Sequence, residues 1–126
     1  MTRAFLTIAS LLGAVGVALG AFGAHGLRNR VDGRMLEVWE TAVRYHLVHA
    51  LALLAVAWMA SRWPSPSLSL AGWLLVVGVA VFSGSLYLMA LTGVRWLGAV
   101  TPIGGLCFLI GWIAVGLIGA RRPSSS

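Results

Sequence analysis

Charged residues are scarce in this sequence. Only 10% of its 126 residues are charged, whereas 60% are hydrophobic. A soluble domain of this length carries about 25% charged residues, so the deficit excludes a chain that has to cover its surface with water-facing side chains. In a bilayer, lipid replaces the water-excluding core, and the length allows one domain. We therefore expect residues 1–126 to form a single integral membrane domain.

Acidic residues and cysteine are rarer still. The three carboxylates all lie in one short segment, at Asp32, Glu37 and Glu40, so the apolar stretches lack the buried carboxylates that ion-coupled transporters use. The single cysteine, Cys107, excludes an intramolecular disulfide and a zinc ribbon. The sequence contains no phosphate-binding loop, nucleophile elbow or zincin helix. These absences favour a protein that is not an enzyme, and we expect no cofactor and no bound metal.

Lysine is absent, and the nine basic residues are all arginines. They occur singly or in pairs, without the basic stripe and interleaved aromatics of a nucleic-acid-binding surface, so we expect no nucleic acid among the partners. Next to apolar stretches, arginines serve as anchors at anionic lipid headgroups. Membrane lipids are therefore the expected partners, while a homo-oligomer or contact with other membrane proteins stays open.

Four apolar stretches are long enough to cross a bilayer, which takes about 20 residues of helix. They cover roughly residues 4–24, 45–61, 69–92 and 97–119. The sequence thus predicts an all-α, polytopic membrane helix bundle with four transmembrane helices and both termini on the same side. The first stretch exceeds the apolar core of a secretory signal peptide, so we expect it to be retained.

Residues 33–45 have a different pattern, because charged side chains follow one face and apolar side chains the other. At about 100° per residue, one stripe continues into the second apolar stretch. Its members are Met35, Trp39, Ala42, His46, His49, Leu53 and Val56. We expect residues 33–45 to form an amphipathic helix, capped near Asp32, that lies at the membrane interface and leads into the second span.

Glycines in the first span share one helix face. Within an arc of about 80° lie Gly13, Gly16, Gly20 and Gly23. Such a stripe is typical of a helix-packing seam, because small residues let two backbones approach closely; a ligand groove or hinge is the alternative. Gly98, Gly105 and Gly116 are nearly in line on the fourth span, which makes that helix the expected partner. Gly26 is expected to end the first helix in the left-handed conformation, with Leu27 folded back onto the last turn.

The three histidines and Tyr45 form the candidate polar site. The chain leaves the membrane after His25 and is expected to re-enter near Tyr45 on the same side, so His25, His46 and His49 should lie at similar depth and converge at the mouth of the bundle. Structural hydrogen bonds are the favoured interpretation; a proton or small-ligand site and a metal or haem site are the alternatives. Helix–helix hydrogen bonds are also expected for three residues of the third span, namely Ser83, Ser85 and Tyr87.

Four blocks of the sequence carry a family resemblance. They are GAFGAHGL (20–27), ETAVRYHLVHALALL (40–54), VFSGSLYLMALTG (81–93) and GAVTPIGGLCFLIGW (98–112). In this order they resemble the YgdD/YwdK-like family of small membrane proteins, the domain of unknown function four-two-three. The resemblance covers nearly the whole chain and implies a four-span, multi-pass protein of the bacterial cytoplasmic (inner) membrane, with no implied activity or catalytic residue.

Two functional hypotheses follow from these observations. The leading one is a non-enzymatic membrane protein, of unknown biochemical role, that organises lipid or a membrane complex. The alternative is a small oligomeric channel or transporter with a His-lined polar mouth.

Overall fold

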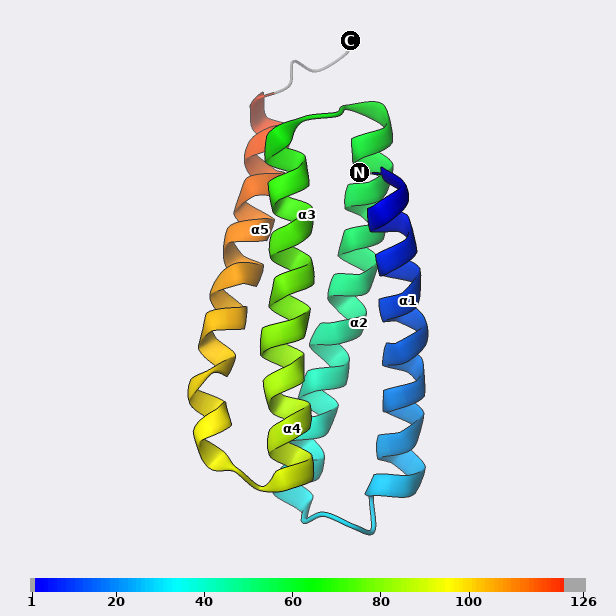
Figure 1. Cartoon of the computed structure of the whole chain (residues 1–126), viewed down its shortest axis with the longest axis vertical. Helices are drawn as coiled ribbons and strands as arrows, with labels where there is room; N and C mark the ends of the chain where they lie inside the picture. Colours follow the sequence, from blue (N-terminus) through cyan, green and yellow to red (C-terminus); the bar gives the residue numbers. More distant parts are fainter. Residues whose placement is uncertain (1, 122–126) are drawn as a thin grey trace.

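The computed structural model describes residues 2–121, and within this range the chain is almost entirely helical and contains no strand. Four helical segments are long and apolar enough to cross a membrane, and they run alternately up and down, so that the first begins where the last ends (Figure 1). The expected all-α bundle with four spans is therefore confirmed. The segments are Thr2–Leu27, Gly33–Arg62, Pro66–Thr92 and Arg95–Arg121.

Three of these segments change their helical geometry along their length. The first is α1 (Thr2–Phe22) followed by a π-helical turn, Gly23–Leu27. The third consists of α3 (Pro66–Gly78), a π-helical turn (Val79–Ser83) and α4 (Gly84–Thr92). A 3₁₀ turn, Arg95–Ala99, precedes α5 (Thr101–Arg121). Both π-helical turns lie at helix contacts described below.

The second segment is one unbroken helix of 30 residues, α2 (Gly33–Arg62). The expected cap is confirmed, because the Asp32 carboxylate accepts a hydrogen bond of 2.8 Å from the backbone N–H of Met35. Residues 33–45 do not form a separate interfacial helix, since they are the first turns of α2 itself. The physical reason is that the apolar stripe continues without a break, and all its residues from Trp39 to Val56 are buried. At 1.5 Å per residue, α2 is about 45 Å long, which exceeds the apolar thickness of a bilayer.

The four segments are not equally enclosed. α2 and the α3–α4 segment lie in the middle, while α1 packs on α2 and α5 packs on α3 at opposite flanks (Figure 1). In the most apolar part of each span, 39% of the residues are buried in the two middle segments but only 17% in each outer one. α1 and α5 therefore present wide apolar faces to the outside of the bundle.

The glycine seam of α1 packs against α2 and not against the fourth span, which corrects the expected partner. A Cβ added at Gly16 would lie 2.5 Å from Leu47 Cδ2, and one at Gly23 would lie 2.5 Å from Trp39 Cδ1. Gly20 faces Val43 at 3.2 Å, whereas Gly13 has nothing within 4 Å. The reason is the flanking arrangement, which puts α5 on the other side of the bundle from α1.

The close approach on α5 occurs at a different glycine from those expected. A Cβ at Gly104 would collide with the backbone nitrogen of Phe82, in the π-helical turn between α3 and α4. Gly98 and Gly105 make only loose contacts, at 3.6 Å to Met89 and 3.8 Å to Phe82, and Gly116 has nothing within 4 Å. Gly104 is thus the residue that lets these two backbones meet.

The cap expected at Gly26 is also wrong. Among the described glycines, only Gly93 has a positive φ, at 73°, where it ends α4. Residues 23–27 instead continue α1 as the π-helical turn, which carries Leu27 into the core. Leu27 is buried together with Trp39 and Ala90, so the turn is held by packing, not by a left-handed glycine.

Candidate functional site

Two side chains of α2 donate hydrogen bonds to the backbone of α1. The indole N–H of Trp39 bonds the carbonyl of Leu19 at 2.8 Å, and Nε2 of His46 lies 2.8 Å from the carbonyl of Leu12. A carbonyl can only accept, so Nε2 of His46 carries the proton. The two donors, Trp39 and His46, are seven residues apart on α2. The two acceptors, Leu12 and Leu19, are likewise seven residues apart on α1.

Glycines of the seam make both bonds possible. Gly16 and Gly23 each follow an accepting carbonyl by four residues, one helical turn further along α1. A side chain at Gly23 would overlap Trp39, and a Cβ at Gly16 would lie 3.2 Å from Cδ2 of His46. The seam therefore exposes backbone carbonyls to polar side chains, besides allowing close packing.

The second ring nitrogen of His46 reaches a third helix. Nδ1 lies 2.9 Å from the hydroxyl of Tyr87 on α4, and in the neutral imidazole it accepts the hydroxyl proton. Nearby, the Ser83 hydroxyl donates to the carbonyl of Ala42 at 2.8 Å. The hydroxyls of Ser85 and Thr101 bond each other at 2.5 Å, across α4 and α5. The polar residues of the third span thus form helix–helix hydrogen bonds, as favoured from the sequence.

His49 lies one turn further along the same face of α2, and its two ring nitrogens have the opposite roles. Its Nδ1 donates to the carbonyl of Tyr45 at 2.7 Å, and its Nε2 accepts from the indole N–H of Trp112, on α5, at 3.0 Å. The ring also stacks on Phe108, with centroids 3.6 Å apart and planes inclined by 12°. Because an indole N–H can only donate, this geometry requires a neutral imidazole with an unprotonated Nε2.

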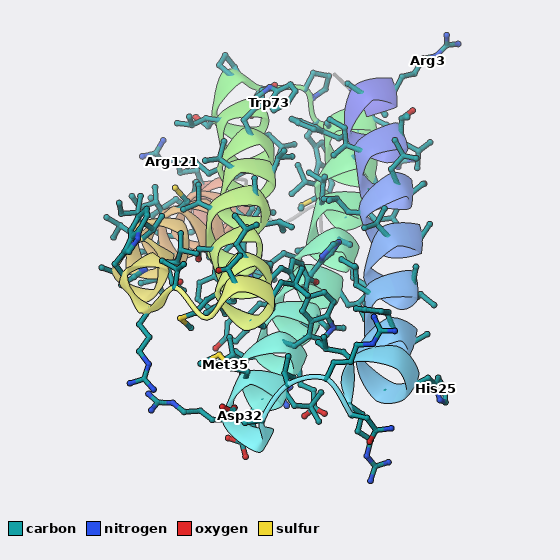
Figure 2. All side chains as sticks on the ribbon, turned by 60° about the horizontal axis from the view of Figure 1, so that its bottom comes forward. Arg3, His25, Asp32, Met35, Trp73 and Arg121 are labelled. Carbon is teal, nitrogen blue, oxygen red and sulfur yellow. The ribbon has the colours of Figure 1, made fainter. Side chains whose placement is uncertain are left out.

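His25 lies far from the other two histidines. It is exposed on the π-helical turn that ends α1, and Figure 2 shows it pointing away from the bundle. His46 bonds Leu12, which precedes His25 by 13 residues, or about 20 Å of helix. The expected convergence at one depth is not found, because α2 begins at Gly33 and its early turns carry His46 into the middle of the bundle. Among residues 2–121, no three His, Cys, Asp or Glu side chains gather closely enough to hold a metal ion.

A groove opens beside His49 on the outside of the bundle, between α2 and α5, and we call it the α2–α5 groove. Its volume is about 490 Å³, and its wall is mainly aromatic, with Tyr45, His49, Phe82, Phe108 and Trp112 among its residues. A smaller hollow of about 160 Å³ continues from Tyr45 and His49 to Arg44. The candidate residues His49 and Tyr45 therefore share one site, whereas His46 lies where α2 contacts α1 and α4.

Sequence reasoning missed Trp112, Phe108 and Arg44 as residues of this groove. A signal was present for Trp112, because an indole in the middle of an apolar span, away from the headgroup region, needs an acceptor for its N–H. Nothing in the pattern indicated that this acceptor was His49, 63 residues earlier.

Comparisons with known proteins agree with a membrane location and assign no activity. Residues 19–105 match the family described as "Protein of unknown function (DUF423)". The chain is 43% identical over 114 residues to the UPF0382 membrane protein YwdK of Bacillus subtilis, which covers 90% of this chain and 93% of that protein. It is 45% identical over 111 residues to the UPF0382 membrane protein SSP2132 of Staphylococcus saprophyticus, which covers 88% and 92%. No solved structure matches.

Proposed function

The chain belongs to the DUF423 family, whose curated relatives are named only as membrane proteins, and on this premise we propose a non-enzymatic role in the bacterial cytoplasmic (inner) membrane. In this role the protein organises lipid, or a complex with other membrane proteins, through the surfaces of its outer helices.

The observation that carries this proposal is the unequal burial of the four spans. In the spans that contain α1 and α5, only 17% of the residues in the most apolar part are buried. These helices therefore offer most of their apolar side chains to surrounding molecules. The polar side chains described above are engaged in tying one helix to the next, as with His46 and Tyr87 or Ser83 and Ala42. This division favours a rigid bundle whose contacts with lipid or protein lie on its outside.

Purification in a mild detergent tests the proposal. The full chain should retain a defined lipid or a defined membrane protein, identified by native mass spectrometry and by sequencing of co-purified chains. After reconstitution into liposomes it should give no selective flux of protons, cations or small solutes. Selective flux that is lost in His46→Gln or His49→Gln would overturn the proposal and favour a small channel or transporter.

A further inference from the structure

We propose that the α2–α5 groove is a binding site for one anionic phospholipid, whose phosphate lies at Arg44 and Tyr45 and whose acyl chain lies along Phe108 and Trp112. This inference rests on the proposed function in its first form, in which the protein organises lipid. It names the binding site and the class of lipid.

The groove has an apolar wall that is already fixed. His49 is held between the Tyr45 carbonyl and the Trp112 indole, and Phe108 stacks on its ring. Both nitrogens of His49 and the N–H of Trp112 are therefore engaged, and the groove offers these groups' carbon surfaces to a ligand. A preformed apolar wall suits a hydrocarbon chain, since little has to be ordered when the chain binds.

The polar groups lie at one end of the groove. Arg44 is exposed, and no ion pair or hydrogen bond joins its guanidinium to another residue in the range 2–121. The Tyr45 ring is held against Phe82, with centroids 4.6 Å apart, while its hydroxyl has no bonded partner in the same range. One cation and one hydroxyl thus come from successive residues that line the same small hollow, and together they match a phosphate group.

The depth of Arg44 in the bundle fits a headgroup. Its neighbour Val43 packs against Gly20 of α1, seven residues before that helical segment ends at Leu27, so Arg44 lies about 10 Å from the end of α1. An arginine side chain can carry its guanidinium over part of that distance toward the interface while its stem stays on apolar surface. The charge at the rim selects an anionic lipid over a zwitterionic one, and the chain's net charge of +6 acts in the same direction.

A second groove of similar size provides the matched control. It lies between α1 and α2, has a volume of about 420 Å³, and is lined by apolar and small residues with no charged side chain, including Gly13 and Leu51. A Cβ at Gly13 meets nothing within 4 Å, and one at Gly105 in the α2–α5 groove comes no closer than 3.8 Å to Phe82. A Cβ at either position therefore fits without forcing two helices apart, and each glycine lines its own groove, which a leucine side chain is expected to occupy.

The test uses the full chain in nanodiscs with phosphatidylglycerol or phosphatidylcholine that carries a photoactivatable group on its acyl chain. Labelled peptides are mapped by mass spectrometry. Phosphatidylglycerol should label residues 102–112 of α5 more than residues 9–17 of α1, and more than phosphatidylcholine does. Arg44→Gln should lower the preference for phosphatidylglycerol about fivefold, Tyr45→Phe should lower it less, and Gly105→Leu should abolish labelling of α5.

Two control variants should keep the wild-type labelling of α5: Gly13→Leu, in the other groove, and Arg34→Gln, an exposed arginine away from both grooves. Monodisperse elution of every variant excludes misfolding. Equal labelling by both lipids, or equal labelling of α1 and α5, would overturn this inference and leave the proposed function standing if a lipid still co-purifies. A defined membrane protein that co-purifies and suppresses the labelling of residues 102–112 would also overturn the inference, while it would support the proposed complex with other membrane proteins.

Discussion

His46 and His49 lie one turn apart on α2 and yet hold their protons on different nitrogens. The Leu12 carbonyl places the proton of His46 on Nε2, whereas the Tyr45 carbonyl places that of His49 on Nδ1. The unprotonated nitrogen of each imidazole then accepts a hydrogen bond. His46 accepts from the hydroxyl of Tyr87, and His49 accepts from the indole N–H of Trp112. The two residues thus tie α2 to three different helices.

This arrangement predicts a specific nitrogen spectrum. In protein labelled with ¹⁵N-histidine and held in lipid, we expect one buried histidine as the Nε2–H tautomer and one as the Nδ1–H tautomer. In Trp112→Phe, which keeps an aromatic ring and removes the donor, only the Nε2 resonance of His49 should shift. Two identical tautomers, or a doubly protonated His49 at neutral pH, would contradict the described hydrogen bonds.

Two substitutions at His46 distinguish what its hydrogen bonds contribute to stability from what the volume of its side chain contributes. His46→Gln keeps a donor for Leu12 and an acceptor for Tyr87, so it should remain folded with little loss of stability. His46→Leu removes both functions and should lower the free energy of unfolding by about 1–2 kcal/mol. Thermal unfolding in detergent measures the difference, and elemental analysis of the wild type should find no stoichiometric metal. Equal stability of the two variants would show that the two hydrogen bonds contribute nothing.

Among the helices, the contact of α5 with the π-helical turn Val79–Ser83 depends on one glycine of an adjacent pair. Gly104→Ala would place a Cβ against the backbone nitrogen of Phe82, which cannot move aside as a side chain can. We expect a loss of about 1–3 kcal/mol. Gly105→Ala has its nearest contact at 3.8 Å and should be tolerated. Thermal unfolding of the two variants provides the comparison, and equal melting temperatures would mean that α5 does not approach Phe82 so closely.

The contact of α1 with α2 predicts a similar contrast between neighbouring residues. Gly16→Leu should disrupt it, because the new side chain meets Leu47 and displaces His46 from the Leu12 carbonyl. Val17 is 64% exposed, so Val17→Leu should leave the melting temperature in detergent unchanged. If both variants melted like the wild type, the glycine seam would have to face lipid.

Local periodicity predicted the helices and the buried face of α2, but not the partners of the individual side chains. The stripe from Trp39 to Val56 could be found because its period is contained in consecutive residues. The intrinsic freedom of Gly26 predicts a left-handed cap, yet the packing of Leu27 against Trp39 outweighs that preference. The pairing of His49 with Trp112 joins two helices that only the complete bundle brings together.

The spacing of the glycines in α1 predicts the packing seam but not the helix that packs against it. Five residues separate Leu27 from Gly33, and so short a connection favours packing of α1 on the next helix along the chain. The in-line glycines on the fourth span predict that this span packs against the seam. That prediction is wrong because a pattern of small residues indicates which face of a helix packs, but not which helix packs against it.

For the whole molecule, the up-and-down order of the four segments predicts the sidedness of each connection. Reporter fusions at residues 30 and 94 should give one location, and fusions at residues 65 and 126 should give the other. The cluster of arginines after the first span, at Arg28, Arg30 and Arg34, favours a cytoplasmic location for the first pair. Termini on opposite sides would contradict the four-span arrangement.

The two N–H donors of α2 also have a consequence for how α1 and α2 slide along each other. Apolar helices in lipid have many nearly equivalent alignments, because hydrocarbon solvates them as well as they solvate each other. Trp39 and His46 meet Leu19 and Leu12 simultaneously in one alignment only, and a slip of one turn, about 5.4 Å, breaks both bonds. These two side chains therefore set the register of the α1–α2 hairpin.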